Sequence, residues 1–217
     1  MSWIQRLKSA FGQGEGTNGS TTVPVQDVRY SMPTVAADVL TFVEPTPATY
    51  QGAPRFHEDE WCQIEFLPGS GLQQLKGRLG QYKVFEQAHR LEHGWSRIHA
   101  RQWPREVVIE GDDATSKLAA LFAVELLHAP ILATSSVALG QVQDGFALRP
   151  SSDVLLYGLA DARGITALGA TVAGDDTQLS RVFSVLYGAY GLLLVDWRGQ
   201  LVLCEVDAGG QFAAWRP

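Results

Sequence analysis

The sequence predicts an α+β protein in which helices pack on a mixed or antiparallel sheet. Short strand-like runs and stretches of helical period follow one another in no regular β-α order, which is typical of this class. The chain has 217 residues, of which 46% are hydrophobic, so it can bury a substantial core. A short unit also recurs in the second half. We therefore expect one large domain or two small ones.

The recurring unit begins with the tetrapeptides at residues 110–113 and 173–176, which both contain Gly-Asp-Asp. Each is followed by an apolar stretch of helical period and then by an apolar run, at 131–133 in the first copy and 192–194 in the second. We interpret this pattern as a duplication. The C-terminal half is thus predicted to be built from two related strand-helix-strand units.

Composition divides the chain into three segments. Residues 1–22 combine a short amphipathic segment, with Trp3, Leu7 and Phe11 at helical spacing, and a flexible linker rich in glycine and small polar residues. Residues 23–105 are expected to hold the first strands and a long basic helix. Residues 106–217 form the duplicated half, which can be continuous with 23–105 in one domain.

In the N-terminal half, strands are predicted at 39–43 and 60–67, and the second alternates as a strand with one buried face does. Residues 72–102 contain no proline and are predicted to be helical. Their apolar positions fall on two faces about half a turn apart. A kink or break is therefore expected near Gly80, because glycine weakens a helix.

In the C-terminal half, the elements follow from apolar runs and turn residues. Helices are predicted from a cap at Asp113 or Thr115 to about His128, and over 177–190, where an aspartate can again cap the helix. Strands are predicted at 107–109, 131–134, 136–142, 145–148, 154–157, 166–172, 192–197, 201–206 and 211–215.

The formal net charge of −6 is unevenly distributed. Residues 1–70 carry −4, residues 71–105 carry +5 and residues 106–217 carry −7. A basic segment therefore lies between two acidic ones. Such asymmetry fits a phosphate-rich ligand, an acidic partner or internal charge balance.

The candidate partner-binding residues are Glu58, Asp59, Glu60 and Trp61, which follow His57 just ahead of a predicted strand. Their carboxylates suit a partner with a basic surface, and tryptophan is a frequent hot-spot residue. The alternative is a solvated loop whose tryptophan packs on the core.

The candidate metal ligands are Glu86, His89 and His93, which would share one face of the predicted helix. An exposed polar face explains them better, because no HExxH pattern or further ligand accompanies them. The Gly-Asp-Asp pairs are a second candidate, although helix capping alone accounts for both copies. A metal-assisted hydrolase is therefore an alternative function.

Nucleic-acid binding through the basic helix 76–105 is a further alternative, and an acidic chain with scattered basic residues argues against it. The residues concerned are Lys76, Arg78, Lys83, Arg90, Arg97, Arg101 and Arg105, with Tyr82, Trp95 and Trp103 between them.

Two distant cysteines, Cys62 and Cys204, indicate neither a disulfide scaffold nor a zinc site, so a reduced, cytoplasmic setting is expected. No apolar stretch approaches the roughly 20 residues of a membrane span, and no motif indicates a cofactor. We therefore expect a non-enzymatic protein-binding module. By analogy of composition alone, it resembles a toxin-neutralising, immunity-type or accessory protein of a bacterium.

Overall fold

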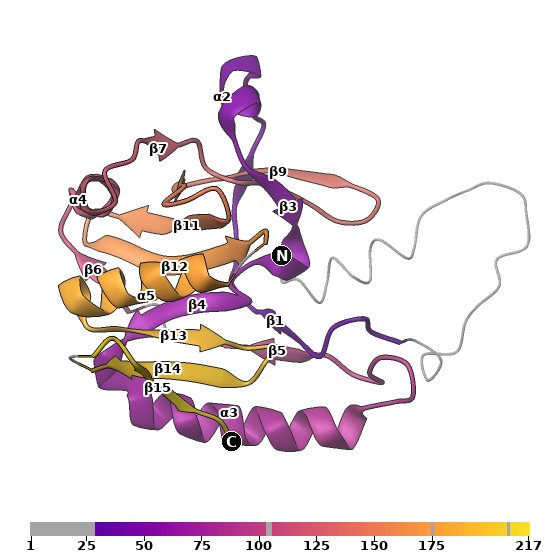
Figure 1. Ribbon diagram of the computed structural model, residues 1–217. Helices are drawn as coiled ribbons and strands as arrows, with labels where there is room; N and C mark the ends of the chain where they lie inside the picture. Colours follow the sequence, from indigo (N-terminus) through magenta and orange to yellow (C-terminus); the bar gives the residue numbers. More distant parts are fainter. Residues whose placement is uncertain (1–28, 103–105, 175, 208) are drawn as a thin grey trace, which may run out of the picture.

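A computed structural model describes residues 29–102, 106–174, 176–207 and 209–217 (Figure 1). Within these residues the strands form sheets of nine, four and two strands, on which helices pack. The predicted α+β class with antiparallel and mixed pairing is confirmed. The predicted amphipathic segment and linker, residues 1–22, lie outside the described residues.

The large sheet has the order β15-β14-β13-β4-β12-β11-β10-β7, and β6 pairs with the same edge of β12 as β4. Every pair in it is antiparallel. Its strands are β4 (Ile64–Pro68), β6 (Ile109–Glu110), β7 (Leu126–Leu127), β10 (Gly145–Leu148), β11 (Val154–Asp161), β12 (Gly164–Val172), β13 (Leu192–Asp196), β14 (Leu201–Val206) and β15 (Phe212–Trp215).

The N-terminal half contributes β4 to the middle of this sheet, between β12 and β13 of the C-terminal half. Helix α5 (Thr177–Tyr190) connects β12 to β13, which run parallel to each other on either side of β4. The two halves of the chain therefore share one hydrogen-bonded sheet.

Two smaller sheets flank the large one. The four-stranded sheet has the order β2 (Phe42–Val43), β9 (Ala138–Val142), β8 (Ile131–Ala133) and β3 (Arg55–His57), and β8 and β3 are parallel. The two-stranded sheet pairs β1 (Thr34–Ala36) with β5 (His99–Arg101), also in parallel. Helix α2 (Pro47–Gly52) projects beyond the four-stranded sheet (Figure 1).

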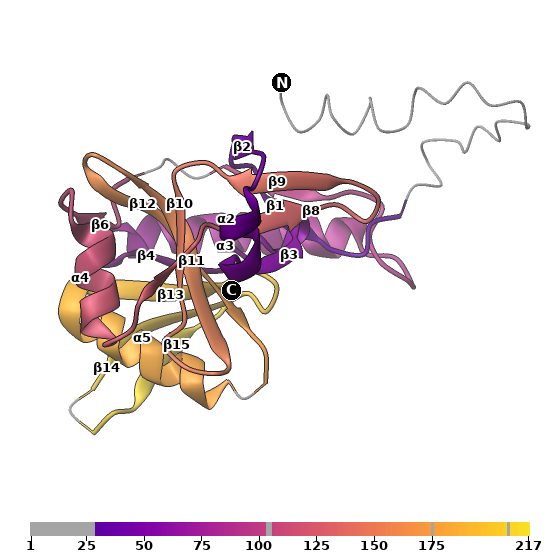
Figure 2. The same cartoon turned by 90° about the horizontal axis from the view of Figure 1, so that it is seen from above.

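Both faces of the large sheet are covered, as the alternation along β4 shows. Phe66 is fully buried in the core that includes α4 (Ala114–Leu121) and α5. The next residue, Leu67, is 3% exposed and belongs to the core under α3 (Leu72–His89). A third core lies between the four-stranded sheet and the large sheet. Figure 2 shows α5 on the other side of the large sheet from the four-stranded sheet. The predicted single buried face of this strand is therefore wrong.

The helix predicted over 72–102 ends earlier than predicted, and the predicted break near Gly80 is absent. Helix α3 is continuous through Gly80 and ends at His89. Arg90 is extended, Gly94 has a φ of +84°, and the Leu91 N–H donates to the Gly94 carbonyl oxygen at 2.9 Å. Leu91 and Trp95, which continue the second apolar pattern in the sequence, therefore lie beyond the helix in this turn.

Two other boundaries differ for similar reasons. The strand predicted over 60–67 begins at Ile64, because residues 58–60 form a 3₁₀ turn and Cys62 has a φ of +50°. The helix predicted to reach His128 ends at Leu121, because Ala123 adopts a φ of +53°. A positive φ interrupts both helix and strand in an L-residue chain. The predictions for 145–148, 177–190 and 201–206 are confirmed.

The two predicted units differ in the sheets they join. The second unit, β12-α5-β13, lies wholly in the large sheet, whereas the first unit ends in β8 of the four-stranded sheet. Helix α4 has 8 residues and α5 has 14. A duplication of this unit stays a prediction.

Helix α5 allows a paired test of its boundaries. A Cβ at Gly188 would meet no atom within 4 Å, so Gly188→Ala should raise the free energy of unfolding by about 0.5–1 kcal/mol. Gly191 ends the helix at a φ of +65°, where alanine is strained, so Gly191→Ala should lower it by about 1 kcal/mol. Urea denaturation measures both changes. Shifts of the same sign in the two variants would contradict a helix that ends at Gly191.

Candidate functional site

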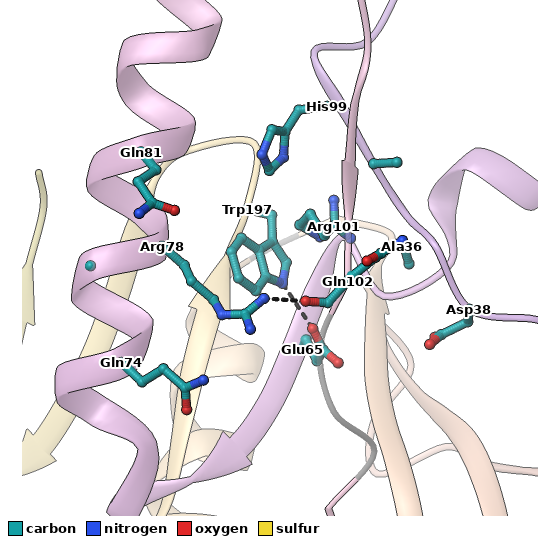
Figure 3. Close-up of a pocket in the computed structure, with 12 residues that line it drawn as sticks. Ala36, Asp38, Glu65, Gln74, Arg78, Gln81, His99, Arg101, Gln102 and Trp197 are labelled. Atoms are coloured by element: carbon teal, nitrogen blue, oxygen red, sulfur yellow. Dashed lines mark hydrogen bonds between the residues drawn. The ribbon is translucent and has the colours of Figure 1, made fainter.

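A half-open cleft of about 550 Å³ lies between helix α3 and strand β5 (Figure 3). Glu65 of β4 and Trp197, the residue after β13, form its floor. The remaining lining side chains come from α3, from β5 and from the chain after β1: Gln74, Arg78, Gln81, His99, Arg101 and Asp38. Five segments of the chain thus meet at one polar site.

Sheet register and helix period place these side chains. Glu65 lies opposite Val195 in the β4–β13 ladder, and Leu67 lies opposite Leu193, so all four share the face under α3. The buried stripe of α3 contains Leu75, Leu79 and Tyr82. Each residue immediately before them lines the cleft, namely Gln74, Arg78 and Gln81.

Arg101 is the most confined charge of the cleft, with 7% of its surface exposed. Its guanidinium donates to Thr34 Oγ1 at 3.0 Å, to the Cys62 carbonyl oxygen at 2.8 Å and to Gln63 Oε1 at 3.4 Å. It also lies 4.9 Å from the ring centre of Trp197, a cation–π distance. Burial lowers the pKa of Arg101, and the Glu65 carboxylate acts in the opposite sense.

Two carboxylates of the cleft are held by buried indoles. Trp197 Nε1 donates to Glu65 Oε2 at 2.8 Å, and Trp61 Nε1 donates to Asp38 Oδ2 at 2.9 Å. Both tryptophans are 3% exposed. The indoles therefore fix the two carboxylates in place. The negative charges of these carboxylates balance the positive charges of Arg78 and Arg101 in the lining.

The acidic residues predicted to bind a partner form a 3₁₀ turn behind the cleft. Glu60 Oε1 accepts from Arg198 Nη2 at 2.6 Å, and Asp59 lies 3.5 Å from the His57 ring. Trp61 packs on Tyr157 in the core, with ring centres 5.0 Å apart, so its indole does not reach the surface. The hydrogen bond from Trp61 to Asp38 connects this turn to the lining of the cleft. Partner binding by the three carboxylates stays a prediction.

Tyr157 holds this turn rigidly. Its hydroxyl accepts from the Cys62 N–H at 2.9 Å and donates to the Glu60 carbonyl oxygen at 3.0 Å. Burial raises the pKa of Tyr157 well above its ordinary value. A Cβ at Gly169 would lie 2.9 Å from the Tyr157 ring, so the ring needs a glycine opposite it.

The structure does not bring Glu86, His89 and His93 together on one helical face, because α3 ends at His89. Glu86 is 7% exposed and accepts from Arg90 at 2.9 Å and from Trp95 Nε1 at 3.1 Å. Over the described residues, no group of three or more His, Cys, Asp or Glu side chains is placed to hold a metal ion.

The aspartates of the repeated tetrapeptides do not cap their helices as predicted. Asp113 and Asp176 precede α4 and α5, yet neither side chain makes a capping hydrogen bond. Asp113 pairs instead with Lys117 at 2.8 Å, one turn into the helix, and this bond lowers the pKa of Asp113. Asp175 lies outside the described residues.

The basic residues of 76–105 do not share one helix. Arg101 is buried in β5, Arg90 pairs with Glu86, and Arg78 donates to the Gln102 carbonyl oxygen. Trp103 and Arg105 lie outside the described residues.

His99 should make stability fall in mild acid. Burial, aided by the Arg101 charge, lowers the pKa of His99 below 6.5, and its buried Nδ1 has no hydrogen-bond partner among the described residues. His99 therefore binds its second ring proton more tightly in the unfolded chain than in the folded one. The contribution of neutral His99 to the free energy of unfolding is complete above pH 6.5 and is lost as the pH falls below that value. We expect the loss of melting temperature between pH 7.5 and 5.5 to be smaller in His99→Gln. An equal loss in both proteins would contradict this assignment.

Comparison with protein-family models, curated proteins and solved structures finds no match to this chain. Within the described part of the chain, no helix has both the length and the apolar character that crossing a membrane requires.

Proposed function

We propose that this chain is a non-enzymatic protein-binding module and that the cleft between α3 and β5 receives a segment of its partner. The carrying observation is a half-open polar cleft of about 550 Å³ whose charged groups are anchored by the fold. A volume of a few hundred Å³ with fixed polar groups is typical of ligand sites. Anchored groups lose little entropy on binding, which favours recognition.

The charge balance of the cleft favours a polypeptide over a nucleic acid. Asp38 and Glu65 oppose Arg78 and Arg101, so a phosphate chain would meet as many carboxylates as cations. Carboxamides of Gln74 and Gln81 can both donate and accept hydrogen bonds, as the peptide groups of a partner also do. These groups therefore suit a segment of mixed charge.

The acidic turn at 58–60 adds a flanking contact area for a partner with a basic surface. The Glu60 side chain is 38% exposed and that of Asp59 is 27% exposed, so both can meet incoming cations. We further propose an immunity-type or accessory role in the cytoplasm of a bacterium. The free thiols of Cys62 and Cys204 support a reducing compartment.

Filling the cleft should abolish partner binding. Gly77 lines the cleft on α3, and a Cβ there meets no atom within 4 Å, so Gly77→Leu should fold and occupy the cleft. A tagged chain is used to capture its partner from lysate of the native organism, and mass spectrometry names that partner. The affinity of the purified pair is then expected to fall more than tenfold in Gly77→Leu.

Gly80 gives the matched control, because it lies on the same helix, does not line the cleft and also has open space for a Cβ. Gly80→Leu should keep the affinity of the original chain. Equal affinity of both variants and the original would contradict binding in the cleft. A triple alanine change of Glu58, Asp59 and Glu60 that leaves affinity unchanged would remove the acidic turn from the interface.

A further inference from the structure

Strand β5 uses only one edge of its backbone to pair with β1. The His99 N–H donates to the Pro33 carbonyl oxygen at 2.9 Å, and the Arg101 carbonyl oxygen accepts from the Ala37 N–H at 2.8 Å. The parallel register places Val35 opposite Ala100, so the backbone of Val35 bonds to His99 and Arg101, the two neighbours of Ala100. The N–H and C=O of Ala100 therefore point to the opposite edge.

That opposite edge faces the cleft. Gln102 has the same alternation as Ala100, and its carbonyl oxygen accepts a hydrogen bond from Arg78 of α3, across the cleft. Ala100 is exposed and lines the cleft, and no described residue hydrogen-bonds its backbone. An exposed N–H and C=O pair at a strand edge is a template for a further strand.

We propose that the partner segment binds in extended form as a third strand on the free edge of β5, within the cleft, where it displaces Arg78 from the Gln102 carbonyl oxygen. This rests on the proposed function and specifies the conformation of the bound segment. A strand in this position pairs at about 4.8 Å from β5 and hydrogen-bonds the Ala100 backbone. Main-chain bonds supply affinity, and the side chains of the cleft supply specificity.

Charge complementarity defines the side chains of this segment. Successive residues of a strand point to opposite sides, so some face the floor of the cleft and others the solvent. On the floor of the cleft, the Glu65 carboxylate, which accepts a hydrogen bond from Trp197, can pair with a basic side chain of the segment. Arg78 on the wall offers a guanidinium to an acidic one. The occupant is therefore an extended polypeptide segment with both a basic and an acidic residue.

The test uses a pair of substitutions at Ala100. Ala100→Pro removes the N–H at the free edge and keeps the bonds to β1, because proline is tolerated on an edge whose N–H is unpaired. Ala100→Val keeps the N–H and suits a strand. The probe is a linear peptide selected against the original chain from a displayed random library. We expect its affinity, by fluorescence polarisation, to fall at least tenfold in Ala100→Pro and to stay within twofold in Ala100→Val.

Amide exchange gives a readout that needs no folded variant. Saturation of the ¹⁵N-labelled original chain with the peptide should slow exchange of the Ala100 amide at least tenfold. Equal affinity of the proline and valine variants, or unchanged Ala100 exchange, would overturn strand pairing. If Gly77→Leu still abolishes binding in that case, the cleft function survives and only the strand is wrong. Failure to select any peptide, or one insensitive to Gly77→Leu, would overturn both.

Discussion

Replacing Arg101 by methionine is expected to lower the free energy of unfolding by about 3 kcal/mol. Methionine keeps much of the apolar stem but leaves the Cys62 carbonyl oxygen and Thr34 Oγ1 without this donor in the interior. Each unsatisfied buried polar group costs about 1–3 kcal/mol. The Glu65 carboxylate, which acts to raise the pKa of Arg101, also loses this positive charge. Urea denaturation with a linear extrapolation measures the change.

Arg181 provides the control for this substitution, because it is an exposed residue of α5. Arg181→Met should leave stability unchanged within error. A loss under about 1 kcal/mol in Arg101→Met would show that the hydrogen bonds of Arg101 do not stabilise the cleft floor.

Replacing Tyr157 by phenylalanine is expected to cost about 1–3 kcal/mol, with the ring packing retained. The change removes the acceptor of the Cys62 N–H, and this residue is buried at a φ of +50°. The Glu60 carbonyl oxygen keeps a second donor, the Gln63 N–H at 3.3 Å, so the loss falls on Cys62. Thermal and urea denaturation of the variant measure the loss.

Tyr50 supplies the matched control, since its hydroxyl accepts from Arg55 at 2.9 Å in an exposed position. Tyr50→Phe should change stability by less than about 0.5 kcal/mol, because water replaces the lost partner. Similar losses in the two tyrosine variants would contradict the view that the buried hydroxyl fixes the turn at 58–63.

The elements that could be predicted from sequence are those with strong local signals. Helix α5 has a clear apolar stripe and a glycine at its end, and β13 and β14 flank a short turn. The predicted helix extends past the end of α3 because Leu91 and Trp95 continue an apolar pattern. Residues 99–101 instead pair with β1, more than 60 residues away, and a helical window does not contain that partner.

The sequence does not predict the cleft, for the same physical reason. Glu65 and Trp197 are 132 residues apart, and Asp38 and Trp61 are 23 apart, so neither bond leaves a local pattern. The cluster at 57–61 lies next to the cleft, because Trp61 donates to Asp38 in its lining, and its role in partner binding stays a prediction. The alternative in which its tryptophan packs on the core is confirmed, because Trp61 is buried against Tyr157.

Site-specific photo-cross-linking tests the binding cleft most directly. A benzophenone side chain is placed at Gln81, which lines the cleft, and in a second protein at Gln87, which is exposed on the same helix outside it. Irradiation of each with the partner captured by the original chain should give a cross-link from Gln81 to one short segment and none from Gln87. Cross-linking from Gln87 alone, or from Gln81 unchanged by Gly77→Leu, would contradict binding in the cleft.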